Sequence, residues 1–127
     1  MQTVDVFPDI EIMMISAMAP LFPDYRFTST LPAILPSVAV RFKRISGASR
    51  DIRIDRPIVD TDTFTSDYGT SSLVSRQVHA AMLSLRGVAL LTGVVQSVIS
   101  VEGPRWLADP NQSLTRFGAT VELHIHV

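Results

Sequence analysis

The end of the chain, FGATVELHIHV at residues 117–127, alternates at every position between an apolar side chain and a polar or small one. Successive side chains of a β-strand point to opposite faces, so this pattern predicts a strand with one buried and one polar face. The apolar face carries Phe117, Ala119, Val121, Leu123, Ile125 and Val127. Such a face has to pack against another layer of secondary structure, and this requirement constrains the rest of the fold.

Two amphipathic helices are predicted to supply that layer. In each, apolar side chains recur with the three- and four-residue spacing that builds one helix face. The first helix carries Ile10, Met13, Met14, Ala17 and Met18, and the second carries Val74, Val78, Ala81, Met82 and Leu85.

The ends of both helices are marked by capping residues. Asp5 is the expected N-cap of the first helix, with Pro8 in its first turn. The second helix is expected to start at Thr65, Ser66 or Asp67, and to end with Arg86 in its last turn and Gly87 after it.

Further strands are predicted at residues 25–30, 38–45, 58–64 and 94–102, with pairing resuming near residues 52–54 after a turn at 47–49. Pro57 is expected to require a bulge or an edge position, since it lacks an N–H. Within 58–64, the β-branched face of Val59, Thr61 and Thr63 is expected to lie under a helix.

These elements predict an α+β fold in a single domain, residues 1–127. The expected architecture is a mainly antiparallel sheet with two amphipathic helices packed on one face. The other face and the edges of such a sheet are available to a neighbour.

Composition excludes several kinds of chemistry. The chain has no cysteine, so disulfides, cysteine-ligated zinc and thiol catalysis are excluded. It contains no phosphate-binding glycine loop, no nucleophile elbow and no H-E-x-x-H zinc motif. The N-terminus does not read as a signal peptide, and the apolar run at 10–19 is shorter than a membrane span. We therefore expect a soluble protein without a catalytic site.

Two polar patterns are candidates for chemical sites. Asp60 and Asp62 share one face of the 58–64 strand, where they could bind a metal or act as an acid/base pair, but a solvated outer face is favoured. His124 and His126 form an H-x-H pair on one strand face, and no third ligand is indicated by spacing. His79 is expected to be structural.

The charges are unevenly distributed, although the net charge is −1. A basic segment contains Arg41, Lys43, Arg44, Arg50, Arg53 and Arg56, and an acidic segment with Asp60, Asp62 and Asp67 follows it. The two segments could make complementary contacts between copies of the chain, or each could be a solvated surface.

The stretch EGPRWLADPNQSLTRF, residues 102–117, holds the only tryptophan. Gly103-Pro104 is expected to break the preceding strand, and Asp109-Pro110-Asn111 suits a turn. Arg105, Trp106 and Leu107 would then lie in a long hairpin connection, as a cluster of the residue types that dominate binding interfaces. Alternatively, Trp106 folds back onto the sheet as a lid on the core.

This order of elements, ending in GPRWLADPNQSLTRF and a long alternating strand, resembles the tail terminator (tail completion) proteins of long-tailed, siphovirus-type bacteriophages. The sequence is most similar to those of phages that infect actinobacteria. The segment DRPIVDTD at residues 55–62 and the Leu-Arg-Gly at 85–87 also match. Thr61 and Thr63 depart from the family, where valine-like residues are expected.

The resemblance implies a structural virion protein without enzymatic activity or cofactor. Such proteins form a ring, commonly a hexamer, that caps the tail tube, ends its growth and joins it to the head connector. The implied partners are further copies of the chain, the major tail tube protein, and a head-completion, stopper or connector protein. Genomic DNA would pass through the lumen without specific binding, no membrane would be involved, and assembly would take place in the host cytoplasm.

The residues expected at subunit or partner contacts are Arg105, Trp106, Leu107, Arg50, Arg53, Arg56, Asp60 and Asp62. Two alternatives remain open at this point. One is a stopper or adaptor protein of the neck between head and tail. The other is a small α+β ligand-binding or metal-dependent hydrolytic domain that uses the face of His124 and His126.

Overall fold

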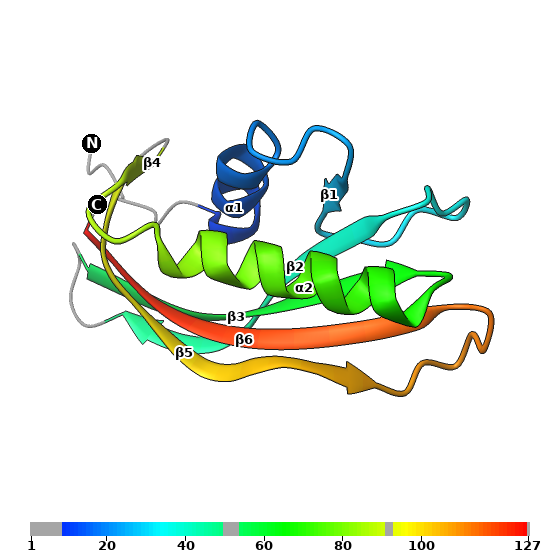
Figure 1. Ribbon diagram of the computed structural model, residues 1–127. Coiled ribbons are helices and arrows are strands. Elements are labelled where there is room, and N and C mark those ends of the chain that lie inside the picture. The colour runs from blue at the N-terminus through cyan, green and yellow to red at the C-terminus, as the bar shows by residue number, and fades with distance from the viewer. Residues whose placement is uncertain (1–8, 50–53, 91–92, 127) are drawn as a thin grey trace, which may run out of the picture.

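The computed structural model describes residues 9–49, 54–90 and 93–126. Its elements are α1 (Ile10–Met18), β1 (Arg26–Thr28), β2 (Ala39–Ser49), β3 (Ile54–Thr65), α2 (Tyr68–Leu83), β4 (Ala89–Leu90), β5 (Gly93–Leu107) and β6 (Thr115–His126). The strands form one sheet in the order β1-β2-β3-β6-β5-β4 (Figure 1).

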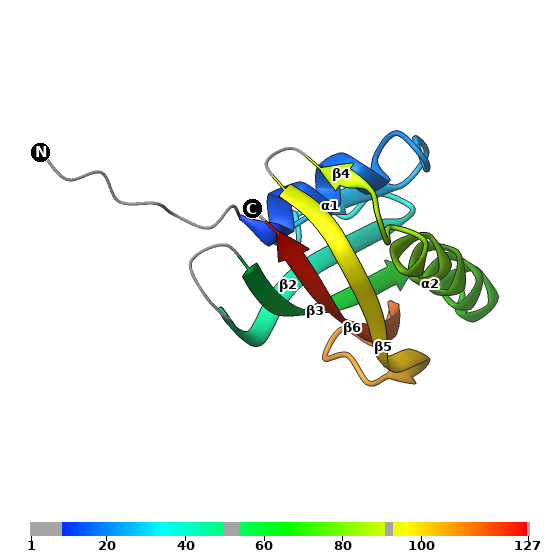
Figure 2. The same cartoon turned by 90° about the vertical axis from the view of Figure 1, so that its left-hand side faces the viewer.

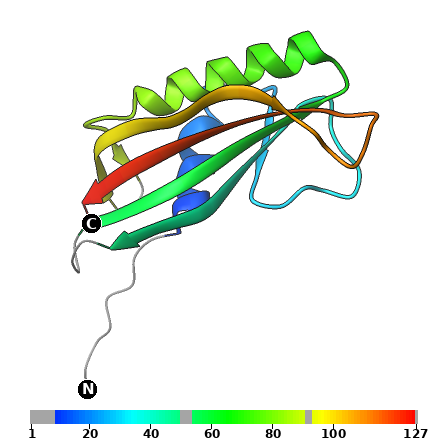
Figure 3. The ribbon, with the colours of Figure 1, turned by 90° about the horizontal axis from the view of Figure 1, so that it is seen from below.

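The predicted α+β class is confirmed, but the sheet is mixed. β1 pairs in parallel with β2, whereas β2–β3, β3–β6, β5–β6 and β4–β5 are antiparallel. Residues 29–38 join β1 to β2 and carry the chain back to the same end of the sheet, so that β2 runs parallel to β1. Both helices lie on one face of the curled sheet (Figures 1 and 2), and Figure 3 shows the opposite face, which we call the open face.

The buried face of α1 is confirmed, and its N-terminus is corrected. Ile10, Met13, Met14 and Met18 are buried. The N-cap is Asp9, whose carboxylate accepts hydrogen bonds from the backbone N–H groups of residues 11 and 12. Asp5, the expected cap, and Pro8 lie outside the described residues.

The start of α2 is confirmed at one of the three predicted caps. The Asp67 carboxylate accepts a hydrogen bond from the backbone N–H of Thr70 at 2.8 Å. The helix ends at Leu83, so Arg86 lies beyond its last turn. Gly87, with φ of +81°, turns the chain toward β4, and its N–H donates to the carbonyl of Val95.

Strand boundaries differ from the prediction where glycine and proline were read as breaks. β2 continues through Gly47, which pairs with Pro57 and has φ of +109°. A Cβ on Gly47 would collide with the carbonyl oxygen of Arg56, so the close approach of the two backbones depends on glycine. Pro57 lies in a central strand. The pairing of β3 with β6 is interrupted after Asp55 and continues in the same register from Ile58.

The core lies between the sheet and the two helices. The predicted inner face of β3 is confirmed, because Val59, Thr61 and Thr63 are all buried. The Thr61 hydroxyl donates to the sulfur of Met82 on α2 at 3.2 Å, and this bond accommodates a polar group where a valine-like residue was expected. At the other end of the core, the rings of Phe27 and Phe42 stack at 5.8 Å.

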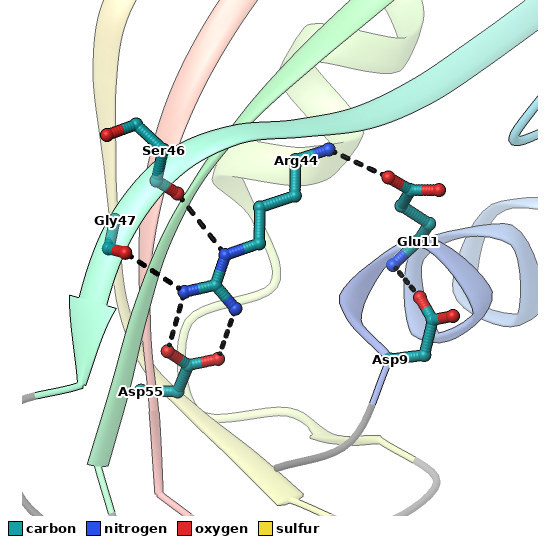
Figure 4. Close-up of polar contacts among 6 residues, drawn as sticks. All are labelled: Asp9, Glu11, Arg44, Ser46, Gly47 and Asp55. Atoms are coloured by element: carbon teal, nitrogen blue, oxygen red, sulfur yellow. Dashed lines mark hydrogen bonds and ion pairs between the residues drawn. The ribbon is translucent and has the colours of Figure 1, made fainter.

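An ion pair between Arg44 of β2 and Asp55 of β3 lies beside α1 (Figure 4). The Arg44 guanidinium binds both carboxylate oxygens of Asp55, at 2.8 and 2.9 Å. The backbone N–H of Arg44 donates to Glu11 of α1 at 3.0 Å. The register of β2 shifts between Arg44 and Ser46, and this bulge accompanies the contact with the helix. One of the predicted basic charges is therefore paired within the chain.

Among the helices of the described residues, neither is long and apolar enough to span a bilayer.

Candidate interaction surface on the open face

Four of the residues predicted at partner contacts meet on the open face. Asp60 and Asp62 on β3 and Arg105 and Leu107 on β5 line a small polar depression around Gly118 of β6. The strand register brings them together, since Gly118 lies between Asp62 on one side and Arg105 on the other. The sequence alone could not predict this register, because Asp62 and Arg105 lie more than forty positions apart along the chain.

Asp62 is buried, so the expectation of a solvated carboxylate at this position is wrong. It is only 3% exposed. Arg41 donates from Nη2 to Oδ2 at 2.7 Å, and Arg116 donates from Nε and Nη2 to Oδ1 at 3.2 and 3.1 Å. Charge-assisted hydrogen bonds of this kind compensate the loss of water around the carboxylate.

The two arginines also cover an aromatic ring. The guanidinium carbon of Arg41 lies 5.4 Å from the centroid of Phe64, and that of Arg116 lies at 5.9 Å. Phe64 is 2% exposed although it points away from the helices, because the arginine side chains lie over it. We call Arg41, Asp62, Phe64 and Arg116 the arginine cluster. Sequence reasoning did not identify Arg116, and Arg41 was seen only as part of a basic run.

The other charged residues that line the depression, Asp60 and Arg105, have partners in their own chain. Thr120 donates to Asp60 at 2.6 Å, across the β3–β6 pair. Arg105 forms an exposed ion pair with Glu102. Both residues keep part of their surface in water, so they remain accessible to a partner.

Trp106 lies in a strand and not in a hairpin connection. β5 continues past Gly103 and Pro104 to Leu107. The register shifts between Glu102 and Arg105, where Gly103 and Pro104 form a bulge with only one residue of β6 opposite them. Trp106 is 55% exposed, so the alternative in which it covers the core is wrong. Alternation along the strand places it on the face opposite to Arg105 and Leu107.

The predicted basic residues near the β2–β3 turn are only partly described. Arg50 and Arg53 lie outside the described residues. Arg56 lies on β3 opposite Ala48, with its Nε atom buried and without a hydrogen-bond partner. The proposed contact of these charges with a neighbouring copy therefore stays a prediction.

Two of the three histidines, His79 and His124, are bound by side chains of the protein. His124 Nε2 lies 3.0 Å from Glu122 Oε2. His79 is 8% exposed and shares a hydrogen bond with the Ser100 hydroxyl at 2.9 Å, and burial lowers the pKa of its imidazole. In the part of the chain that the structure describes, no three acidic or histidine side chains are grouped to hold a metal.

Comparison with known proteins gives a match at the level of the fold. The sequence matches no protein-family model and no curated protein. The structure is similar to a chain in a solved structure described as "Virion of native gene transfer agent (GTA) particle". The TM-score is 0.67 at 12% sequence identity, and the match covers 93% of this chain and 95% of that one.

Proposed function

We propose that this protein is a structural component of a phage-like virion, which forms a ring on the end of the tail tube. The observation that carries the proposal is the similarity of fold to a chain of the gene transfer agent virion over nearly the full length of both chains. The sequence resemblance to tail terminators narrows the role to ending tube growth and joining the tail to the head connector.

The distribution of exposed groups supports a role in assembly. Among the described residues, no helix covers the open face (Figure 3). The depression around Gly118, lined by Arg105 and Leu107, lies on this face. Trp106 exposes a large apolar ring on the opposite side of the same strand. Tryptophan and arginine supply much of the binding energy at protein interfaces, so both sides of β5 are suited to contacts.

A ring of identical copies requires contacts between two different surfaces of the chain. We assign Arg105, Trp106 and Leu107 to contacts with a neighbouring copy or with the tube. Arg50, Arg53, Arg56 and Asp60 are assigned to the same network of contacts, and Asp62, which is buried, takes part in it through the two arginines that it binds. The tail tube protein and a connector or stopper protein would lie on the two sides of the ring, with DNA passing through its lumen.

The test is to determine the assembly state and the position in the particle. Native mass spectrometry of the purified chain is expected to show a closed oligomer, and cryo-electron microscopy of particles is expected to place that ring at the head-proximal end of the tube. A ring that contacts only head proteins would instead identify a stopper or adaptor. A chain that stays monomeric and is missing from particles would overturn the proposal.

A further inference from the structure

The arginine cluster carries more positive charge than its own chain neutralises. Arg41 and Arg116 both bind the single carboxylate of Asp62, which leaves one excess positive charge. The side chains of the two arginines are only 23% and 25% exposed. Both guanidiniums are held over Phe64, so their positions are fixed before any partner arrives.

The arginines also keep unused hydrogen-bond donors. The contacts with Asp62 use Nη2 of Arg41 and Nε and Nη2 of Arg116. Within the described residues, the Nη1 groups make no hydrogen bond, and Nε of Arg41 is buried without a partner. A fixed, partly desolvated guanidinium loses less conformational entropy on binding than an exposed lysine, and its planar fork fits a carboxylate. The cluster is therefore suited to accept a further carboxylate.

Among the described residues, one acidic side chain has no hydrogen-bond or ion-pair partner of its own. Every other Asp or Glu among the described residues caps a helix or turn, or binds a hydroxyl, a backbone N–H or a basic side chain. Asp24 makes no hydrogen bond and no ion pair there. It is exposed, and it lies in the loop that leads from α1 to β1.

Asp24 and the arginine cluster lie on opposite sides of the molecule. The loop between α1 and β1 belongs to the helix layer (Figure 1). The arginine cluster lies on the open face, because Asp62 and Phe64 alternate along β3 with the inner residues Thr61 and Thr63. The two cannot meet within one chain. They can meet between copies, in a head-to-tail contact that joins two different surfaces, which is the kind of contact that closes a ring.

We propose that Arg41 and Arg116 of one copy bind the carboxylate of Asp24 of the neighbouring copy. This inference rests on the proposed ring and names one of its contacts. Lys43, an exposed cation without an ion pair among the described residues, is a weaker candidate, because ion pairs of exposed side chains contribute little. Arg56 is half-buried and also has no ion pair there, but no second guanidinium and no aromatic ring hold it in place.

A double-mutant cycle on the assembled protein tests the contact. Asp24→Asn and Arg116→Gln are each expected to raise the dissociation constant between copies about tenfold, and the double variant no further than the stronger single one. Arg76→Gln, which removes an exposed arginine on α2, is the control and should leave assembly unchanged. Additive effects of the two variants would overturn the proposal.

Folding is checked separately, because Arg116 also binds Asp62. Thermal melting of each variant at a concentration below assembly detects any loss of the fold. Asp24 makes no hydrogen bond or ion pair within the described residues, so Asp24→Asn is expected to melt like the wild type. If this variant assembles like the wild type, the proposed contact does not exist, whatever Arg116→Gln does.

A peptide experiment separates the contact from the ring. A synthetic peptide of residues 19–27, APLFPDYRF, is titrated into the isotope-labelled chain. Saturable shifts of the Arg41 and Arg116 Nε–H signals are expected, and none with the peptide that carries Asn at position 24. Binding without any ring would contradict the proposed function and leave this contact standing. A ring without peptide binding, and insensitive to Asp24→Asn, would contradict this contact alone.

Discussion

Trp106 lies directly opposite Phe117 in the β5–β6 ladder, yet 55% of Trp106 is exposed and only 5% of Phe117. The ring of Tyr68, at the start of α2, meets Phe117 edge-on at 5.1 Å and covers it. Trp106 has no comparable cover. Two cross-strand aromatic neighbours thus have different surroundings, and they are expected to have different roles.

Substitution of Trp106 by alanine is expected to impair assembly more than folding. The free energy of unfolding should fall by less than about 1 kcal/mol, since half of the side chain is already in water. Loss of a central interface aromatic costs about 2 kcal/mol of binding, which raises the dissociation constant between copies about thirtyfold. Urea denaturation and native mass spectrometry measure the two quantities.

Phe117→Ala is the matched control on the neighbouring strand. It removes a buried ring and should lower the free energy of unfolding by about 3–5 kcal/mol. If Trp106→Ala destabilises the fold as much as Phe117→Ala, Trp106 is a folding residue and its assignment to an interface is wrong.

Replacement of Asp62 by asparagine is expected to destabilise the isolated chain strongly. Arg41 and Arg116 would lose their common carboxylate while they remain partly buried, and breaking a buried ion pair in this way costs about 3 kcal/mol. Equilibrium denaturation in urea measures the change. Asp109→Asn, which alters a half-buried acid that accepts a solvent-exposed hydrogen bond in a turn, should cost much less. A loss below about 0.5 kcal/mol for Asp62→Asn would show that the cluster contributes nothing to the fold.

Burial of His79 predicts that stability falls as the pH is lowered through the histidine range. Its pKa is lower in the folded than in the unfolded state, so the unfolded chain takes up the proton first. Stability is therefore highest above the unfolded pKa of about 6.5 and declines below it. The free energy of unfolding measured between about pH 8 and pH 5 should show the decline.

The comparison with His79→Gln isolates this residue from the other histidines. Glutamine does not titrate and can still bond to the Ser100 hydroxyl. The variant should therefore lose most of the decline. An unchanged pH profile in the variant would assign the decline to other groups.

Two periodic patterns of the sequence, the alternation in β6 and the helical spacing in α1, predicted these elements well, because burial alone determines them. The inner face of β6 and the apolar face of α1 follow from the spacing of Phe117 to Ile125 and of Ile10 to Met18. The breaks at Gly47 and at Gly103-Pro104 were predicted wrongly, since bulges and shifts of register carry the strands through them. Local propensity contains no information about a partner strand that tolerates such a bulge.

The candidate site was only half predictable for a related reason. Asp62 and Arg105 were predicted from short segments. Asp62 shares a strand face with Asp60, and Arg105 stands next to Trp106 in the sequence. The arginine cluster depends on Arg41, 21 residues before Asp62, and on Arg116, 54 residues after it. Only the pairing of three strands brings these charges together, and this pairing cannot be derived from one strand at a time.

Gly118 offers a test of the depression itself. A Cβ at this position would collide with the Cδ1 atom of Leu107 and lie 3.2 Å from Oδ1 of Asp62. Gly118→Ala should therefore lower the free energy of unfolding by about 1–2 kcal/mol, because Leu107 has to leave its place over the strand. Equilibrium denaturation in urea measures the loss.

The same collision predicts a rescue. With Leu107→Ala already in place, Gly118→Ala should cost less than it does in the wild type, since the space above the strand is then empty. The residual cost would report the approach to Asp62, whose carboxylate is fixed by two arginines and cannot move aside. Equal costs of Gly118→Ala in both backgrounds would show that Leu107 does not lie over Gly118 in solution, and the depression would lose one of its walls.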